Sequence, residues 1–471
     1  MDFACPLALN FAKFIQGIFL SLKLILVMKT FSLRPCIWSS VMRRKLGRFL
    51  VLLSVIFVGV STQYGFAQEW KFESQREQIS PRSYGDTKIT FHNKPTLGLA
   101  GGGKEYADGH WSKTIAVEAG QYYQFQTFFK AKNVEEPGRC IQGRIIWFDN
   151  SGNQVGFTEY PVTASAKSPE GWNIMEKLYQ VPSPATKAKL ELHYRWDADG
   201  TVNFTEATFE KSVPPESRKV KLATVFHRPR NSKSPQENLE QFSALVKQAA
   251  DQKADIICLP EGITLVGTTL NYVSASEPIP GKTTDYLGNV AKQHNIYIVA
   301  GILEKDGDVV YNTAVLIDRK GNVAGKYRKV SLPREEIDGG VTPGDATPVF
   351  DTDFGRIGIM ICWDVTFPET ARALARQGAE VIFLPIWGGY VKLAMARALE
   401  NQVYVVSSSY DMISAVFDLE GNVLKEATTE NPVIVTEVDL NQQKLWPWIG
   451  DLKSRIPREM PTEKAVDVGH Y

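Results

Sequence analysis

Cysteine is scarce in this sequence, with five residues in 471, and Cys5 and Cys36 fall within the first 67 positions. Only Cys140, Cys258 and Cys362 remain beyond them. Three cysteines cannot all pair, so no disulfide framework is implied and at least one thiol stays free. Histidine is nearly as rare, with six residues in no close cluster, and no Cys-x-x-Cys pair occurs. This pattern argues against a structural metal, and we expect no cofactor.

A surplus of positive charge is also missing. The formal net charge is +1, but residues 1–67 hold eight of the basic residues and a single acidic one. The remainder carries 45 basic and 51 acidic side chains, a net charge of −6. No basic block occurs, so the composition argues against a nucleic-acid partner and against attraction to anionic membranes.

Long apolar runs are confined to residues 1–67, which we expect to be a leader. From Met42 a basic segment, Arg43–Arg48, precedes about a dozen apolar residues and small residues ahead of a cut before Gln68, as in a signal peptide. We therefore expect Met42 to be the true start and the protein to be exported, either periplasmic or secreted. The alternative is a membrane anchor through the apolar stretch Phe14–Val27.

Beyond the leader, prolines and charges in "SVPPESRK" (212–219) indicate a linker. Before it, residues 68–211 alternate apolar and polar side chains between Gly, Asn and Asp turns, which predicts an all-β sandwich or jelly-roll domain. The segments "WFDNSGNQVG" and "DGTVNFTEATFE" resemble jelly rolls of the carbohydrate-binding-module type. That resemblance implies a glycan or surface partner stacked on aromatics such as Trp111, Trp147 or Trp196, whereas the alternative places these rings in the core.

After the linker, strands and helices alternate over residues 220–471, which predicts a layered α/β domain. The apolar runs "VKLATVFH", "DIICLPEG", "IYIVAGIL" and "AEVIFLPI" predict buried strands. Expected helices lie in "SPQENLEQFSALVKQAADQKA" (234–254), with Ser234 as N-cap, and at Lys282–His294, Pro368–Gln377 and Lys392–Asn401. A hairpin is expected with its turn near Gly321–Asn322.

Three residues with chemical potential follow predicted strands. Glu261 comes directly after "DIICLP", Lys329 stands at the end of the hairpin, and Cys362 interrupts "RIGIMICWDVTFPE" between a strand and a helix. Ligands of α/β folds sit beyond the carboxyl ends of strands. A carboxylate there can serve as a base, and a thiol at a helix N-terminus can serve as a nucleophile. Taken singly, each residue also has an ordinary structural interpretation.

Together these segments resemble the nitrilase, or carbon–nitrogen hydrolase, superfamily over nearly all of residues 220–440. The resemblance rests on "LPEG" with Glu261, "YRKVSLP" with Lys329 and "GIMICWDVTFPE" with Cys362, at spacings of 68 and 33 residues, and on "ARALENQVYVV" (396–406). It implies an α-β-β-α sandwich with a Glu-Lys-Cys triad. Glu261 would act as base, Cys362 would form a thioester, and Lys329 with the Trp363 N–H would stabilise the oxyanion.

The resemblance also implies a supporting glutamate after the lysine motif. "PREEID" offers Glu335 and Glu336, which the sequence does not separate, and we favour Glu335. Asp364 and Arg372 are expected to be structural partners. Ser331 stands where many relatives have His, which places carry-over of a particular substrate in doubt.

Three functional interpretations compete. The first is a hydrolase of non-peptide C–N bonds acting on a small linear amide or carbamoyl substrate, with nitriles less favoured. The second is an N-acyltransferase that uses the same acyl-enzyme. The third is a glycan-binding protein with an inert α/β domain, which the intact Glu261, Lys329 and Cys362 argue against. The family resemblance further implies a homodimer or larger assembly through the helices Thr366–Gln377 and Lys392–Asn401.

Overall fold

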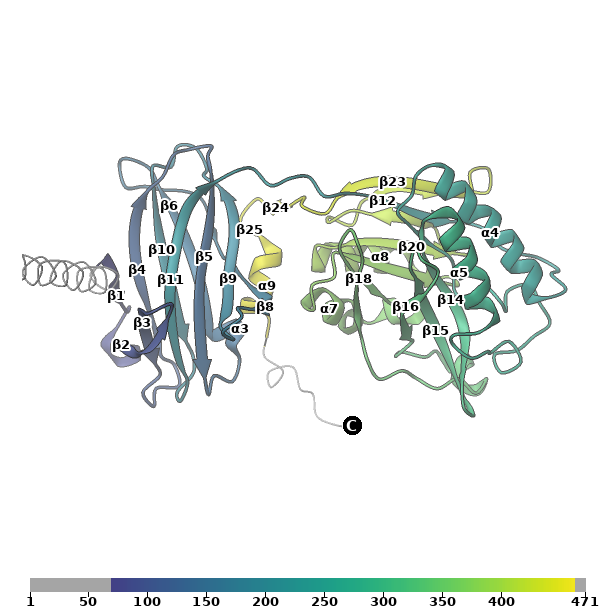
Figure 1. Cartoon of the computed structure of the whole chain (residues 1–471), viewed down its shortest axis with the longest axis horizontal. Coiled ribbons are helices and arrows are strands. Elements are labelled where there is room, and N and C mark those ends of the chain that lie inside the picture. The colour runs from purple at the N-terminus through teal and green to yellow at the C-terminus, as the bar shows by residue number, and fades with distance from the viewer. Residues whose placement is uncertain (1–68, 462–471) are drawn as a thin grey trace, which may run out of the picture. The chain divides into compact units, whose positions relative to one another are not determined.

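The computed structural model describes residues 69–461 (Figure 1). The predicted leader, with its start at Met42 and its export or anchor segments, lies outside the described residues. Within the described part of the chain, none of the helices has the length and apolar character needed to cross a lipid bilayer.

Residues 71–212 form two antiparallel sheets packed face to face, as predicted for an all-β sandwich. One sheet has the order β1-β4-β10-β6-β7, with bounds Lys71–Glu73, Asp108–Ala116, Lys187–Arg195, Ile141–Phe148 and Gln154–Glu159. The other has the order β2-β3-β11-β5-β9-β8, with bounds Arg82–Phe91, Lys94–Ala100, Thr201–Ser212, Tyr122–Lys132, Asn173–Gln180 and Val162–Lys167. Two short helical turns, η1 (Glu77–Ile79) and α3 (Pro137–Cys140), lie in the connections.

The alternation predicted for the sandwich is visible in β5, where Tyr123, Phe125 and Phe129 are buried and their neighbours are more exposed. Each such aromatic side chain contributes about 1.5–3 kcal/mol when fully buried. The three tryptophans proposed for glycan stacking differ in their surroundings. Trp147 is fully buried in the core, and Trp111 is half-buried with its Nε1 donating to the Gly98 carbonyl at 3.3 Å.

Trp196 is the exposed member of that trio, at 41% exposure. The guanidinium groups of Arg139 and Arg195 lie 5.0 and 5.8 Å from the centre of its ring. Stacking on a sugar ring therefore stays a prediction for Trp196, while burial removes Trp147 from the candidates.

The α/β domain contains two six-stranded sheets. The first has the order β16-β15-β14-β13-β12-β23, with bounds Val323–Arg328, Val309–Ile317, Tyr297–Asp306, Ile256–Cys258, Lys219–Val225 and Val433–Asp439. The second has the order β17-β18-β19-β20-β21-β22, with bounds Val349–Asp351, Arg356–Ile359, Val381–Ile386, Tyr404–Ser409, Ser414–Phe417 and Val423–Ala427. In each sheet the central strands β12-β13-β14 and β18-β19-β20 are parallel.

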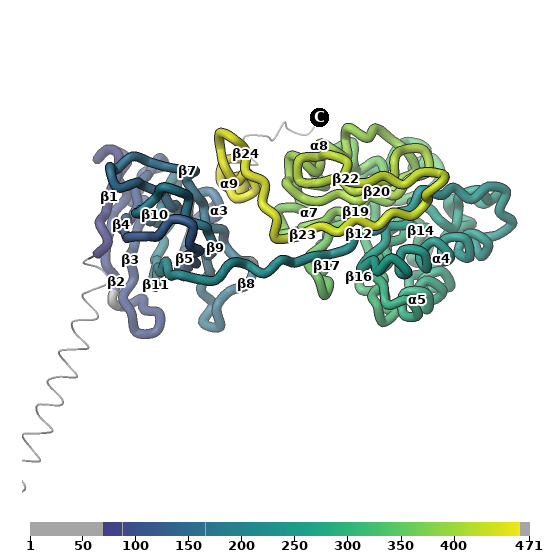
Figure 2. The backbone as a smooth tube through the Cα atoms, turned by 90° about the horizontal axis from the view of Figure 1, so that it is seen from above, coloured from purple at the N-terminus to yellow at the C-terminus, as the bar shows by residue number. Residues whose placement is uncertain are grey.

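Helices cover the outer face of each sheet, which gives the predicted α-β-β-α layers (Figures 1 and 2). Their bounds are α4 Pro235–Asp251, α5 Lys282–His294, α7 Pro368–Arg376 and α8 Val391–Asn401, and shorter turns are α6 Arg334–Asp338 and η2 Cys362–Thr366. Ser234 caps α4 as expected, because its side chain accepts the Glu237 N–H at 3.3 Å. The fold class predicted from the sequence is confirmed.

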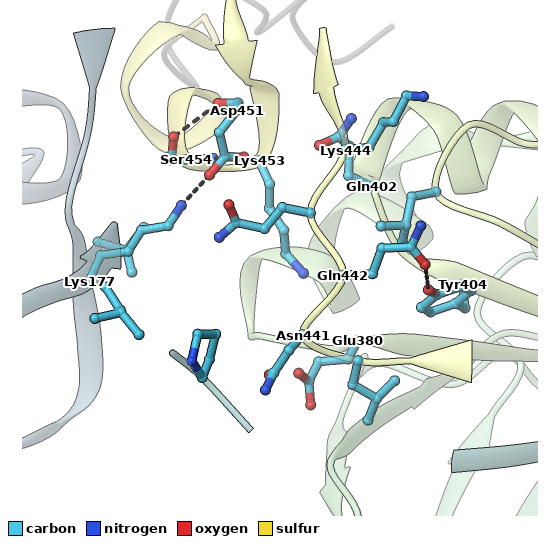
Figure 3. A pocket seen from close by; sticks show the side chains of 16 residues that line it. Lys177, Glu380, Gln402, Tyr404, Asn441, Gln442, Lys444, Asp451, Lys453 and Ser454 are labelled. Atoms are coloured by element: carbon cyan, nitrogen blue, oxygen red, sulfur yellow. Dashed lines mark hydrogen bonds and ion pairs between the residues drawn. The ribbon is translucent and has the colours of Figure 1, made fainter. Parts of the chain in front are cut away.

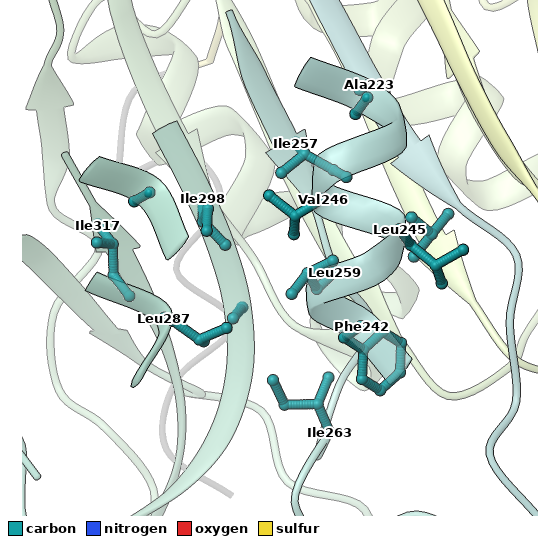
Figure 4. Packing of buried hydrophobic residues seen from close by; sticks show 14 of the residues in the cluster. Ala223, Phe242, Leu245, Val246, Ile257, Leu259, Ile263, Leu287, Ile298 and Ile317 are labelled. Atoms are coloured by element: carbon teal, nitrogen blue, oxygen red, sulfur yellow. The ribbon is translucent and has the colours of Figure 1, made fainter. Parts of the chain in front are cut away.

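Helix α4 packs on the first sheet through side chains spaced three and four residues apart. Phe242, Val246 and Ala249 are fully buried against strand residues such as Ile257 and Ile298 (Figure 4). A second apolar layer lies between the two sheets and includes Cys258, which is completely buried. Burial raises the pKa of the Cys258 thiol well above its usual range, so this thiol stays protonated at neutral pH.

The chain after β23 returns to the sandwich. Tyr404 donates to the Gln442 side chain at 3.0 Å within the α/β domain, and beyond this point Lys177 of β9 pairs with Asp451 (Figure 3). The remaining elements are β24 Leu445–Trp446, β25 Gly450–Asp451 and α9 Leu452–Glu459. β25 packs against β7, and α9 packs against α3. Residues 445–459, which we expected in the α/β domain, therefore pack through β25 and α9 against the sandwich.

Candidate active site

The three residues proposed from the sequence follow the ends of three different strands. Glu261 stands three residues after β13, Lys329 directly follows β16, and Cys362 stands three residues after β18. The sheets bring these ends together: Lys329 Nζ lies 3.0 Å from Glu261 Oε1, and Glu261 interacts with the Cys362 thiol. The three side chains therefore lie together beyond the ends of their strands, where ligands of α/β folds bind.

Glu261 is held by four groups from different parts of the domain. Its Oε1 accepts from Lys329 Nζ and, at 2.7 Å, from Asn312 Nδ2, while its Oε2 accepts the Trp387 N–H at 2.9 Å. The Tyr410 hydroxyl donates to its backbone carbonyl at 2.9 Å. A side chain bonded in this way has one accessible rotamer, so its carboxylate is oriented before any substrate arrives.

Lys329 lies between two glutamates in the protein interior. Its Nζ is 2.5 Å from Glu336 Oε1 as well as 3.0 Å from Glu261, and its side chain is completely buried. An ammonium has three N–H donors, so one is left for another partner. Burial lowers the pKa of Lys329, but the charges of Glu261, Cys362 and Glu336 outweigh burial and raise the pKa above its usual range. Lys329 is therefore a permanent cation.

The Cys362 thiol is protonated in the resting site. Burial raises its pKa, and the Glu261 carboxylate raises it further, while Lys329 acts in the opposite direction. A stable thiolate is therefore not present at neutral pH. A nucleophilic role for this thiol would require removal of its proton, and the Glu261 carboxylate is the basic group in contact with it.

The turn that carries Cys362 is strained and braced by a buried carboxylate. Cys362 has φ +45°, in the left-handed region where a residue with a side chain costs about 1–2 kcal/mol. Asp364 accepts the Ile361 N–H at 2.9 Å, the Tyr327 hydroxyl at 2.7 Å and the Ser331 N–H at 2.8 Å. Asp364 thus joins the cysteine turn to the lysine segment, in the structural role expected for it.

The contact between Ser331 and Asp364 also explains why serine in place of the histidine of many relatives preserves this arrangement. The residue contributes its backbone N–H to Asp364, and any residue other than proline supplies that donor.

A cavity of about 250 Å³ opens onto Glu261 and Cys362. Glu261, Cys362, Glu336 and Asn312 form its polar end, and its remaining lining residues are Gly262, Leu265, Tyr272, Leu303, Pro333 and Trp387. Burial raises the pKa of the Tyr272 hydroxyl, and the nearby Glu336 and Glu261 charges raise it further, so Tyr272 is neutral. The cavity therefore presents a thiol and carboxylates to a small ligand, and the Lys329 cation lies directly behind Glu261 and Glu336.

Of the two glutamates offered by the sequence, Glu336 is the one that contacts Lys329. It is buried against Lys329 and Asn312, whereas Glu335, which we favoured from the sequence, is exposed. The helical turn α6 explains the difference, because adjacent residues of a helix point about 100° apart. The Trp363 side chain is 43% exposed and packs edge-on against Phe367. Arg372 faces the charges of α7 and α8 rather than the triad.

Four contributors to the site were missed in the sequence. Asn312 donates to Glu261 and, at 3.3 Å, to Glu336, which keeps the two carboxylates in place. The sequence feature that could have identified Asn312 is a lone amide side chain within the apolar strand "VVYNTAVLI". Trp387 and Tyr410 follow β19 and β20 without any motif. Arg397 donates to the carbonyls of Val365 and Thr366, at 3.1 and 3.2 Å, next to the cysteine turn.

The fold also brings together one histidine cluster that the sequence does not show. His110 of β4 lies opposite His193 of the adjacent strand β10, and Glu191 lies beside both. The atoms of these three side chains that could bind a metal ion lie within 4.8 Å of one another. Glu191 already accepts from Arg144 at 2.6 Å and pairs with Lys189 at 3.1 Å. A metal ion would have to displace these cations, so the group is best described as a buried charge network.

Known proteins resemble the α/β domain. The family model for carbon–nitrogen hydrolases matches residues 221–447. The nitrilase of Pyrococcus abyssi is 40% identical over 228 residues, which are 44% of this chain and 85% of that protein. Omega-amidase NIT2 of Mus musculus is 32% identical over 247 residues, 47% of this chain and 87% of that protein.

Among solved structures, Nit3 of Saccharomyces cerevisiae, a member of branch 10 of the nitrilase superfamily, is 28% identical with a TM-score of 0.42. It covers 47% of this chain and 90% of its own. The family match and the identity to a nitrilase over most of that protein's length agree with each other. The chain belongs to the carbon–nitrogen hydrolase family.

Proposed function

We propose that the α/β domain hydrolyses the C–N bond of small linear amides or carbamoyl compounds through a thioester on Cys362. The observation that carries the proposal is the position of Glu261, which interacts with both Cys362 and Lys329 at the end of a cavity. The names of relatives, nitrilase and omega-amidase, also favour chemistry at a C–N bond.

The first step is attack of sulfur on the amide carbon. Because the Cys362 thiol is protonated at rest, Glu261 removes its proton as the S–C bond forms. The carbonyl oxygen then becomes an oxyanion. The third N–H of the Lys329 ammonium is the donor proposed for it, together with the Trp363 backbone N–H.

The second step breaks the C–N bond. Glu261 passes its proton to the nitrogen, which leaves as ammonia or an amine, and a thioester remains on Cys362. Glu261, again a carboxylate, takes a proton from water, and the resulting hydroxide attacks the thioester carbon. The carboxylic acid leaves, and the proton held by Glu261 returns to the sulfur, which restores the resting enzyme.

The experiment is a comparison of wild type with Cys362→Ala and Cys258→Ala. We expect Cys362→Ala to lower ammonia release from a small amide by about 10³-fold or more, with the fold preserved. We expect Cys258→Ala to keep most of the activity, because Cys258 lies in the core between the sheets. Mass spectrometry of quenched wild-type enzyme should detect the acyl group on the peptide that contains Cys362.

Loss of activity in Cys258→Ala with retention in Cys362→Ala would overturn the assignment of the nucleophile. The same assay, run with added amines, distinguishes hydrolysis from acyl transfer: a hydrolase yields the free acid as its main product. Nitriles tested in parallel address the remaining alternative.

We propose further that this chemistry takes place outside the cytoplasm, on the basis of the basic and apolar pattern of residues 42–67. Recovery of mature protein beginning at Gln68 from the periplasm or medium would support export, and recovery of full-length protein from the membrane fraction would contradict it.

A further inference from the structure

The walls of the active-site cavity carry no positive charge. Beyond the polar end, its lining residues are glycine, leucine, proline, tyrosine and tryptophan, and no Lys, Arg or His side chain is among the described residues that line it. The apolar walls are formed chiefly by Leu265, Leu303 and Trp387. A ligand in this cavity therefore meets hydrocarbon on its sides and Glu261, Glu336 and Cys362 at its end.

The charged groups at the polar end do not supply the positive charge that the walls lack. The one positive charge of Lys329 is neutralised by the negative charge of Glu261. If Glu336 is also ionised, these three side chains together carry a net negative charge. Burial raises the pKa of Glu336, and with Glu336 protonated the group is neutral. In neither state does the cavity have a net positive charge to offer.

Arg228, a basic group that stacks on one of the wall residues, is already paired. The Arg228 guanidinium lies 5.6 Å from the centre of the Trp387 ring, and its Nη1 bonds to Asp411 Oδ1 at 2.5 Å. Arg228 itself does not line the cavity. Its charge is balanced by Asp411.

The cavity is also narrow. Its volume of about 250 Å³ is below the ~300–1,000 Å³ of typical pockets for drug-sized ligands. A Cβ built on Gly262 would lie 3.8 Å from each of Leu265, Leu303 and Trp387, which is ordinary van der Waals contact on three sides. The walls near the triad thus admit a short chain, not a polymer.

On the basis of the proposed function, we propose that this site selects small amides with a short, uncharged, apolar acyl chain and rejects amides that carry a second carboxylate on that chain. An anionic acyl chain would lose its hydration among apolar walls without gaining a cationic partner. It would also lie close to Glu261 and Glu336, whose charges repel it. An apolar chain of the same length gains from burial against the same walls.

The test measures kcat/KM for ammonia release by the full-length enzyme on acetamide, propionamide, butyramide and succinamate. Butyramide and succinamate form a matched pair, because they differ only in a terminal methyl group against a carboxylate. We expect kcat/KM to rise about fourfold with each added methylene up to butyramide. We expect succinamate to be at least about 100-fold poorer than butyramide. Equal or better turnover of succinamate would overturn the inference while leaving the proposed function standing.

A charge-introducing variant gives a second measurement. Leu265→Arg places a cation on the wall, and Leu265→Gln is its uncharged control of similar polarity. We expect the ratio of kcat/KM for succinamate to kcat/KM for butyramide to be at least about tenfold higher in Leu265→Arg than in Leu265→Gln. A measured Tm shows that both variants are folded. A folded Leu265→Arg enzyme with an unchanged ratio would overturn the inference. Failure of wild type to release ammonia from any amide would instead overturn the proposed function, and this inference with it.

Discussion

Glu335 and Glu336 are neighbours in sequence with opposite surroundings, and they test the site at the scale of single residues. Glu336 bonds to Lys329 at 2.5 Å and shares Asn312 with Glu261, whereas Glu335 is exposed. We predict that Glu336→Gln lowers kcat/KM by about 10- to 100-fold, because a hydrogen bond between charged groups contributes about 1.5–3 kcal/mol.

Glu335→Gln is the matched control, and its kcat/KM should stay within about twofold of wild type. Steady-state ammonia release measures both variants, and circular dichroism checks their folding. Equal losses in the two variants would contradict the role of Glu336 at Lys329.

At the scale of elements, α8 supports the cysteine turn through Arg397. This side chain is nearly fully buried and donates to the Val365 and Thr366 carbonyls of η2 and to Glu400. We predict that Arg397→Gln lowers kcat about tenfold with a smaller change in KM, because the turn loosens while the cavity walls remain. Alkylation of Cys362 by iodoacetamide should slow in parallel.

Arg376→Gln is the control for this prediction, since Arg376 lies exposed in the last turn of the neighbouring helix α7. It should leave both rates unchanged. An Arg397 variant with normal kcat and normal alkylation would show that η2 holds its geometry without the helix.

The contact between the C-terminal segment and the sandwich contains a pH-sensitive carboxyl group. Burial raises the pKa of Glu159 on β7 to about 7, Lys177 opposes this, and Asp451 of β25 adds to it. In the unfolded chain the Glu159 carboxyl has its ordinary pKa of 4.5 and is ionised above that pH. In the folded chain the raised pKa keeps the carboxyl protonated up to about pH 7. The free energy of unfolding therefore falls as pH rises from about 4.5 to 7, by at most about 3 kcal/mol.

Glu159→Gln removes the titrating group and keeps a neutral side chain of the same size. We predict that the Tm of this variant, relative to wild type, increases as pH rises from 5 to 7.5. Differential scanning calorimetry at several pH values measures this difference. A constant difference across the range would show that Glu159 ionises normally in the folded protein.

At the scale of the whole molecule, the surface over η2, α7 and α8 exposes several large apolar side chains. These are Trp363, Phe367, Tyr390 and Leu399. We take these side chains as part of a contact surface, because the family resemblance implied pairing between copies through these helices. We predict a homodimer or larger assembly at micromolar concentration, measured by light scattering.

Leu399→Glu should shift this assembly toward monomer, because it places a charge on the contact surface. Leu424→Glu is the control, since Leu424 is similarly exposed but lies on β22. A wild-type monomer, or equal effects of the two substitutions, would contradict the prediction.

Much of the fold was predictable because its signals are local. Apolar runs predicted the buried strands, Ser234 and the prolines marked helix starts, and turn residues marked the hairpin near Gly321. Period-two alternation likewise predicted the sandwich. The positions of Glu261, Lys329 and Cys362 after strand ends were readable for the same reason, since parallel strands deliver their ends to a common edge.

Burial and side-chain direction were not readable in this way. Trp147 is buried within β6, whereas Trp196 is exposed directly after the end of β10. The choice between Glu335 and Glu336 depends on the rotation of one helical turn. Partners distant in sequence, such as Asn312 with Glu261 or Arg397 with Val365, leave no local pattern.

The sequence by itself therefore determined the order of elements, the two kinds of domain and the chemistry available at three strand ends. The tertiary structure decided which groups surround that chemistry: a lysine between two glutamates, a thiol that burial keeps protonated, and a narrow cavity with uncharged walls. The physical reason is range. Backbone preferences and periodicity act over a few residues, whereas charge balance and burial depend on segments that only folding brings together.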